Sequence, residues 1–180
     1  MIFFPSYSFL NEVADRFVLR YGQTCTVLRQ RSGMQEEERE KFLGRFDEIY
    51  DDQTLLGFCV MGGIFSEGID LKNDSLIGVM IVGTGIPQVC AERELLKQYF
   101  DEKGQNGYDY AYRFPGMNKV QQAAGRVIRT SEDVGIVVLI DDRFLTPACR
   151  RLFPAEWSNA QITDSREVGR LAEKFWNEWL

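Results

Sequence analysis

Residues 118 to 140 read NKVQQAAGRVIRTSEDVGIVVLI, and this stretch decides the fold. Its first part predicts a helix from Asn118 to Thr130, and the apolar run from Gly135 to Ile140 is typical of a buried strand. Comparable apolar runs occur upstream, at Ile2 to Phe4, Thr24 to Leu28, Leu55 to Phe65 and Ser75 to Val82. Short apolar strands that alternate with helices predict an α/β fold with a parallel sheet covered on both faces.

Further helices are expected between these strands, at Phe9 to Tyr21, Gln35 to Tyr50 and Gln88 to Glu102. An aromatic, glycine-bearing loop is expected around Tyr108 to Phe114, before the helix at Asn118. The tail from Ser165 to Leu180 has apolar residues at helical spacing, so we expect an amphipathic helix that packs on the core, with packing on a missing neighbour as the alternative.

The composition narrows the possible functions. A length of 180 residues with 44% hydrophobic residues predicts one domain, and without a long apolar span or leader the expected location is cytoplasmic. The four cysteines form no close ligand pair and there is no histidine, so no metal site is expected and His-dependent nucleophiles are excluded. A net charge of -6 argues against a generally basic nucleic-acid-binding face, so any such contact must be local.

The helix expected at 118 to 130 carries the strongest functional motif. Four residues recur every three or four positions and so share one helix face: Gln122, Gly125, Arg126 and Arg129. Planar arginines suit a transferring phosphoryl group because their N–H donors meet the equatorial oxygens where charge spreads. Gly125 would permit close approach of a backbone. The alternative is a surface helix whose arginines pair with acidic residues nearby.

Residues 62 to 71, GGIFSEGIDL, follow an expected strand and form the second motif. A glycine-rich strand end presents backbone N–H groups and a hydroxyl to phosphate oxygens. Glu67 and Asp70 can orient an arginine, a ribose or a metal-bound water. The alternative is an ordinary tight turn with an acidic helix cap.

The third motif is FPSY at residues 4 to 7, again at the end of an expected strand. Ser6 can bond a nucleic-acid phosphate, and Tyr7 can stack on a base or sugar. The alternative is that Ser6 caps the next helix and the aromatic residues belong to the core.

These segments, in this order and at strand ends, resemble motifs IV, V and VI in the second motor domain of superfamily 2 helicases of the DinG/XPD family. The match rests on FFPSY at 3 to 7, GGIFSEGIDL at 62 to 71 and YRFPGMNKVQQAAGRVIRTSEDVGIVVLIDDRF at 112 to 144. The resemblance implies a RecA-like parallel sheet flanked by helices. It also implies that residues 1 to 180 are the C-terminal motor domain of a larger ATP-dependent DNA helicase, with a role in DNA repair or replication.

By this resemblance, Arg126 and Arg129 would be arginine fingers that reach ATP on a partner lobe, and Gln122 would help set the contact between the lobes. Gly68 and Asp70 would couple the nucleotide state to the grip on DNA. The resemblance also assigns Glu67 and Gly125 to the nucleotide side. The implied track for single-stranded DNA comprises Ser6, Tyr7, Phe65 and Ser66.

The chain departs from a complete motor because it has no GxxxxGK[ST] sequence and no DEAH-like box. We therefore expect ATP and Mg²⁺ to be held mainly by an N-terminal RecA-like lobe of the same protein, which in many family members also carries an iron–sulfur cluster. Two other functions remain open. A non-catalytic RecA-like interaction module would tolerate loss of Arg126 and Arg129, whereas a self-sufficient domain that used Gly83-Thr84-Gly85 as its phosphate cradle would bind ATP unaided.

Overall fold

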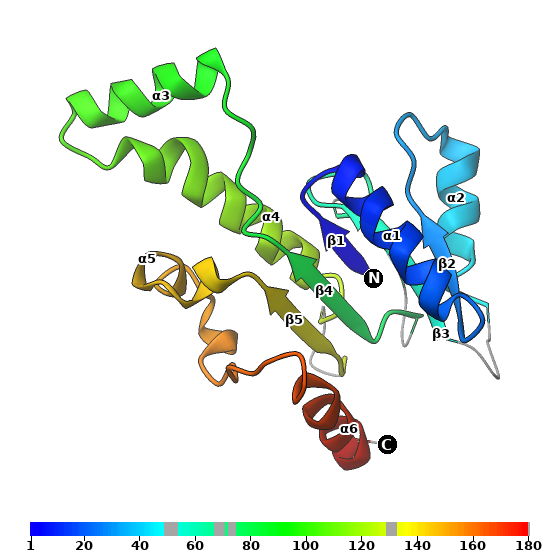
Figure 1. The fold of residues 1–180 in the computed structure, drawn as a ribbon. Coiled ribbons are helices and arrows are strands. Elements are labelled where there is room, and N and C mark those ends of the chain that lie inside the picture. The colour runs from blue at the N-terminus through cyan, green and yellow to red at the C-terminus, as the bar shows by residue number, and fades with distance from the viewer. Residues whose placement is uncertain (49–53, 67–70, 72–74, 129–132, 180) are drawn as a thin grey trace.

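The computed structural model describes residues 1–48, 54–66, 71, 75–128 and 133–179. A five-stranded sheet forms its centre (Figure 1). The strands are β1 (Ile2–Phe4), β2 (Cys25–Arg29), β3 (Thr54–Val60), β4 (Gly78–Val82) and β5 (Ile136–Ile140). Their order is β2-β3-β1-β4-β5, and every pairing is parallel. The expected α/β class is therefore confirmed.

Helices cover both faces of this sheet because successive side chains along a strand point to opposite sides. In β1, Phe4 packs with Leu10 and Ala14 of α1 (Tyr7–Tyr21) on one face. Phe3 belongs to the larger core on the other face, with side chains from α2 (Glu36–Gly44) and α4 (Phe114–Ala124). The α1 face is only partly covered, because Met80 of β4 is 42% exposed.

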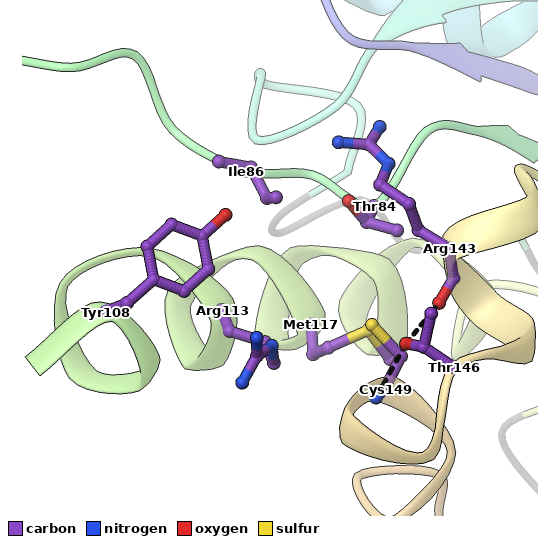
Figure 2. Close-up of a pocket in the computed structure, with 8 residues that line it drawn as sticks. All are labelled: Thr84, Ile86, Tyr108, Arg113, Met117, Arg143, Thr146 and Cys149. Atoms are coloured by element: carbon purple, nitrogen blue, oxygen red, sulfur yellow. Dashed lines mark hydrogen bonds between the residues drawn. The ribbon is translucent and has the colours of Figure 1, made fainter. Parts of the chain in front are cut away.

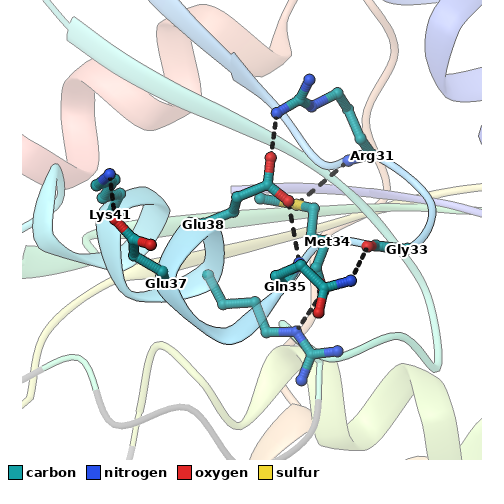
Figure 3. Close-up of polar contacts among 8 residues, drawn as sticks. Arg31, Gly33, Met34, Gln35, Glu37, Glu38 and Lys41 are labelled. Carbon is teal, nitrogen blue, oxygen red and sulfur yellow. Dashed lines mark hydrogen bonds and ion pairs between the residues drawn. The ribbon is translucent and has the colours of Figure 1, made fainter.

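The acidic stretch after Gln35 forms α2, whose start is held by polar contacts (Figure 3). The Gln35 backbone N–H donates to Glu38 Oε2 at 3.0 Å, and Glu38 also pairs with Arg31. Glu37 pairs with Lys41 one turn later, at 2.7 Å. The negative charge therefore lies on the outer, solvated face as expected, while Phe42 is buried. The helix ends at Gly44, so the predicted helix is too long: residues 45–48 are not helical, and the predicted end at Tyr50 lies outside the described residues.

The segment after β4 forms a helical projection away from the sheet (Figure 1). Helix α3 spans Ala91–Glu102, and a short π-helix, Asp109–Arg113, runs directly into α4. The loop expected around residues 108 to 114 is therefore wrong. Its aromatic residues are part of helices instead, and their rings pack against neighbouring rings: the ring centroids of Phe100 and Tyr110 lie 3.9 Å apart. Pro115 is compatible with this continuous path because it occupies the first turn of α4.

The C-terminal helix α6 (Val168–Trp179) forms as expected, but it does not pack into the core. None of its residues is buried, and residues 158–167, which precede it, are all exposed. Its aromatic side chains pack on one another, with the rings of Phe175 and Trp176 5.1 Å apart. This exposed segment carries the chain away from the sheet, which explains why the expected packing is wrong. No helix in the described ranges is long and apolar enough to span a bilayer.

Candidate functional site

The carboxyl edge of the sheet holds two of the three segments that the sequence singled out, those that follow β1 and β3. Strands β2 and β3 lie to one side of β1 within the sheet, whereas β4 and β5 lie to its other side. The strand order therefore reverses between β1 and β4, which makes this position a topological switch point. Ligands of open parallel sheets bind at such points. A crevice of ≈ 420 Å³ lies here, lined by Pro5, Phe9, Val82, Gly83, Thr84, Gly85, Ile86, Asp141 and Arg143.

The segment after β1 combines a helix cap with an exposed polar edge. Ser6 is exposed, and its hydroxyl accepts the Phe9 N–H at 3.3 Å as the N-cap of α1. The alternative interpretation, in which Ser6 caps the next helix, is therefore confirmed. A capping hydroxyl can still donate its own proton outward. Tyr7 is half-buried, and its hydroxyl accepts from Gln30 Nε2 at 3.0 Å.

Beyond β3 the chain forms a tight turn, Met61–Ser66, that contains the glycine pair of the second motif. Gly62 has a φ of +70°, a conformation that glycine adopts without strain. Gly63 is required for space, because a Cβ there would lie 3.0 Å from both Gln30 Nε2 and the Val60 carbonyl oxygen. The expected strand thus ends at Val60, since the apolar residues that follow it belong to the turn.

Phe65 and Ser66 are both fully buried, which corrects the expectation that their side chains lie on a nucleic-acid track. The Phe65 ring stacks on Phe42 with 4.3 Å between the centroids. The Ser66 hydroxyl donates to the Gly63 carbonyl at 2.8 Å. These side chains hold the turn in place and have no surface of their own to offer. The neighbouring candidates Glu67, Gly68 and Asp70 lie outside the described residues.

The third group of candidates lies at the end of α4. Gln122 is exposed on the last turn of the helix, and Gly125 is its C-cap. Arg126 therefore lies just beyond the helix, so the predicted continuous helix face from Gln122 to Arg129 is wrong. Among the described residues, a Cβ on Gly125 would meet only its own helix, at 3.3 Å from the Gln121 carbonyl oxygen. Arg129 lies outside the described residues.

Arg126 connects the second and third motifs. Its Nε donates to the Ser66 carbonyl oxygen at 3.2 Å, although 60 positions separate the two residues along the chain. The arginine is half-buried. A cationic fork beside a glycine-rich turn at a lobe surface can stabilise negative charge on a phosphoryl group presented from outside.

The Gly83-Thr84-Gly85 segment packs tightly against α4. Gly83 and Gly85 have φ values of +84° and +66°. A Cβ on Gly116 would lie 2.6 Å from the Thr84 carbonyl oxygen, so the backbones touch directly. In the described part of the chain, the Thr84 hydroxyl is the buried side-chain oxygen that lacks a hydrogen-bond partner. This close packing gives the segment a structural function in joining β4 to α4.

A smaller cavity of ≈ 150 Å³ adjoins this segment on the α4 side (Figure 2). Figure 2 shows Tyr108 and Arg113 on one side of it and Arg143 on the other. Two hydrogen bonds from the Arg143 guanidinium to Asp141, at 2.8 and 2.6 Å, lower the pKa of that carboxyl. Arg143 is thus held in a fixed orientation at the end of β5. Within the described ranges, no group of three acidic or cysteine side chains is placed to hold a metal ion.

Three structural residues of this region were not found by sequence reasoning. Gln30 and Gly116 carry no local pattern, because their partners lie far away in the sequence. Asp109 is buried at 4% exposure and pairs with Arg113 and with Arg151, which ties the π-helix to α5 (Pro147–Arg150). A lone aspartate in an aromatic segment gave no signal of this bridge.

Comparisons with known proteins agree with this arrangement. A model of the helicase C-terminal domain family matches residues 1–160. The regulator of telomere elongation helicase 1 homolog of Anopheles gambiae is 28% identical over 183 residues, covering 93% of this chain and 18% of the relative. The homolog of Drosophila yakuba is 26% identical over 155 residues, covering 80% and 16%. The chain thus spans less than a fifth of the length of these relatives.

Solved structures of XPD share the fold. One described as XPD helicase superposes with a TM-score of 0.67 at 23% identity, covering 89% of this chain and 27% of that one. A second, described as XPD in the apo form, gives a TM-score of 0.63 at 24% identity, with 84% and 30% covered.

The parallel sheet and the loops at its carboxyl edge define a RecA-like lobe of the kind found in nucleic-acid motors. The chain belongs to the helicase C-terminal domain family, as the C-terminal RecA-like motor domain of the XPD/DinG group of superfamily 2 helicases.

Proposed function

We propose that this chain is the second motor lobe of an ATP-dependent DNA helicase and acts opposite an N-terminal RecA-like lobe of the same protein. The observation that carries the proposal is the contact between Arg126 and Ser66, which brings the third motif against the second. An arginine anchored to the turn can change position when the turn moves, so chemistry and motion can be linked.

Arg126 and Arg129 are proposed to donate to phosphate oxygens of ATP across the cleft between the lobes. Gln122 is exposed on the last turn of α4 and is proposed to help set the contact between the lobes. Glu67, Gly68 and Asp70 continue the second motif and are proposed to respond to the nucleotide, together with Gly125, which ends α4.

ATP and Mg²⁺ fit this chain only as ligands shared with another lobe. The sequence has no phosphate-cradling GxxxxGK[ST] stretch, so this chain offers arginines but no loop that would enclose the phosphates. Bound ATP would supply the free energy of phosphoryl transfer. The residues of this chain would contribute positive charge that is complete only when the lobes are closed. We therefore expect the chain alone to fold as a monomer and to bind ATP and DNA weakly or not at all.

Single-stranded DNA is proposed to cross the carboxyl edge of the sheet. Ser6 is exposed there and Tyr7 is half-buried, and their neighbours Pro5 and Phe9 line the crevice. Hydroxyl and backbone donors can bind phosphates without a basic surface, which is compatible with the net charge of -6. The names of the relatives, which refer to telomere elongation, support a role in DNA repair or replication.

The mechanism follows from these placements. Closure of the two lobes around the nucleotide would bring Arg126 to the phosphates and shift the Met61–Ser66 turn with it. The DNA strand at the carboxyl edge of the sheet would then be bound differently in the closed and open states, so alternation between these states moves the lobe along the DNA.

ATP turnover by the protein that carries both lobes, with and without single-stranded DNA, tests the proposal. Arg126→Ala should remove most of the DNA-stimulated turnover, by ~10³-fold or more if it acts as an arginine finger. Arg16→Ala, which removes an exposed arginine of α1 paired with Glu12, should leave turnover unchanged. Turnover that ignores both DNA and Arg126 would overturn the motor function and favour a non-catalytic interaction module.

A further inference from the structure

Gln30 is a buried polar residue that none of the motifs includes. It follows β2 directly and is only 2% exposed. Its side-chain oxygen accepts the Val60 N–H at 2.8 Å, and its side-chain nitrogen donates to the Tyr7 hydroxyl at 3.0 Å. Its backbone N–H donates to the Phe58 carbonyl at 2.8 Å. One side chain therefore joins the ends of three separate segments.

These contacts fix which way the amide points. The Val60 N–H can only donate, so the amide oxygen must face it and the amide NH₂ must face Tyr7. The Tyr7 oxygen is thereby used as an acceptor, and its own proton is directed elsewhere. Because Tyr7 is only half-buried, its hydroxyl can donate this proton to a phosphate oxygen of a DNA strand that runs along the carboxyl edge of the sheet.

Hydrogen bonds continue from Gln30 through the turn to Arg126. The Gly63 N–H donates to the Val60 carbonyl at 3.1 Å. The Gly63 carbonyl in turn accepts from the N–H of Ser66 at 3.0 Å and from its hydroxyl at 2.8 Å. The Ser66 carbonyl accepts from Arg126 at 3.2 Å. Gly63 also leaves the space that the amide of Gln30 occupies.

We propose that Gln30 is a positioning residue that presents the Tyr7 hydroxyl as a donor to a strand phosphate and links it to the turn that holds Arg126. This inference rests on the proposed function, since it assigns Gln30 to the same nucleic-acid track. Gln30 acts only through Tyr7 and the Met61–Ser66 turn, because it has almost no exposed surface.

A double-mutant cycle in the two-lobed protein tests the inference. Tyr7→Phe keeps the ring and removes the hydroxyl, and Gln30→Met keeps the bulk and removes both amide contacts. Each should raise the concentration of oligothymidine needed for half-maximal ATP turnover by about tenfold, as loss of one hydrogen bond to a charged group would. The double variant should be no worse than the more impaired single variant.

Gln30→Glu provides a second route should Gln30→Met fold poorly. A carboxylate still accepts from Val60, but it also accepts from Tyr7 and so turns the hydroxyl proton inward. The inference expects the same loss of oligothymidine affinity as Tyr7→Phe, with no further loss when the two are combined. Gln121→Met is the matched control, because the half-buried Gln121 amide donates to the Leu152 carbonyl at 2.7 Å, outside this network.

The outcomes separate the two proposals. Independent, additive losses, or folded Gln30 variants with unchanged oligothymidine dependence, would overturn the function assigned to Gln30 while the motor function stands. A wild-type protein with no DNA-stimulated turnover would overturn both. Equal losses in the single variants without addition, together with an unaffected Gln121→Met, would establish Gln30 as a positioning residue.

Discussion

Gly116→Ala should destabilise the protein, although helix propensity alone predicts the opposite. Gly116 lies inside α4, where alanine normally stabilises a helix by about 1 kcal/mol relative to glycine. A Cβ at this position would lie 2.6 Å from the Thr84 carbonyl oxygen and 3.1 Å from the Ile86 nitrogen. Both neighbours are backbone atoms, so no side chain can rotate away.

The cost follows from the displacement that this contact requires. Ordinary contact begins at 3.4 Å, so the segment around Thr84 would have to retreat from 2.6 Å by most of an ångström. Gly85 packs equally closely against α4, because a Cβ on it would lie 2.5 Å from the Gly116 carbonyl oxygen, so this retreat would disrupt the contact along the whole segment. Overpacking of this kind costs about 1–3 kcal/mol, which exceeds the gain in propensity.

Urea unfolding followed by circular dichroism measures the outcome. The midpoint for Gly116→Ala should fall while the slope with urea stays the same. Gly169→Ala is the control, because Gly169 also lies in a helix, α6, but has nothing within 4 Å of its Cβ position. It should be neutral or stabilising. A Gly116→Ala protein as stable as wild type would refute the close packing of α4 against the segment after β4.

Three further predictions concern single side chains. Cys90 is exposed, whereas Cys25, Cys59 and Cys149 are buried, and burial raises the pKa of the Cys59 thiol to about 12. A maleimide near neutral pH should therefore modify only Cys90 in the native protein. Mass spectrometry that shows more than one modified thiol would contradict this. The hydrogen bonds from Arg143 lower the pKa of Asp141 from its ordinary value of 3.8. The contact between the two side chains therefore stabilises the folded state above that pH, and this stabilisation is lost as the pH falls through the folded-state pKa. Asp141→Asn should therefore lower the unfolding free energy at neutral pH, with a difference from wild type that shrinks below pH 3.8 in urea titrations. Phe65→Ala should cost about 3–5 kcal/mol because the ring is fully buried, whereas weaker DNA binding at unchanged stability would restore the idea of a direct contact.

The strands were predictable because each is a short apolar run that ends at a glycine, a proline or a polar cluster. The expected runs at residues 2–4 and 135–140 coincide with β1 and β5 to within one residue. The run at 55–65 was predicted too long. Its second half is equally apolar but folds as a buried turn, and composition does not separate a buried turn from a strand once Gly62 adopts a positive φ.

Helix ends were less predictable because tertiary contacts decide them. The motif from Gln122 to Arg129 has helical spacing, yet α4 stops at Ala124 and Arg126 turns to the Ser66 carbonyl. The aromatic stretch before α4 was expected to be a loop, but ring stacking and the Asp109 bridge make it helical. Neither contact is visible from residues close in the sequence.

The site itself was predictable as a set of loops but not as a network. The sequence located the loops that follow β1 and β3, because parallel strands bring their carboxyl ends to one edge. The third motif lies at the end of α4 instead. The sequence did not indicate that Phe65 and Ser66 are buried. A serine in a glycine-rich turn has the same local sequence whether its hydroxyl donates to a phosphate or, as here, to a backbone carbonyl. Gln30 was missed because its partners are 23 and 30 positions away.

The position of Arg126 beyond the helix has a consequence for a motor of the proposed kind. An arginine inside α4 would be held by the helix, whereas Arg126 lies beyond its end, and one of its bonds is to the Ser66 carbonyl oxygen. That bond joins the guanidinium to a neutral oxygen, while a bond to a phosphate joins opposite charges and can be bidentate. Phosphate oxygens presented by a closing partner lobe can therefore draw Arg126 away from Ser66. Because Ser66 is bonded to Gly63, and Gly63 to Val60 beside Gln30, the same step would be felt at the Tyr7 hydroxyl.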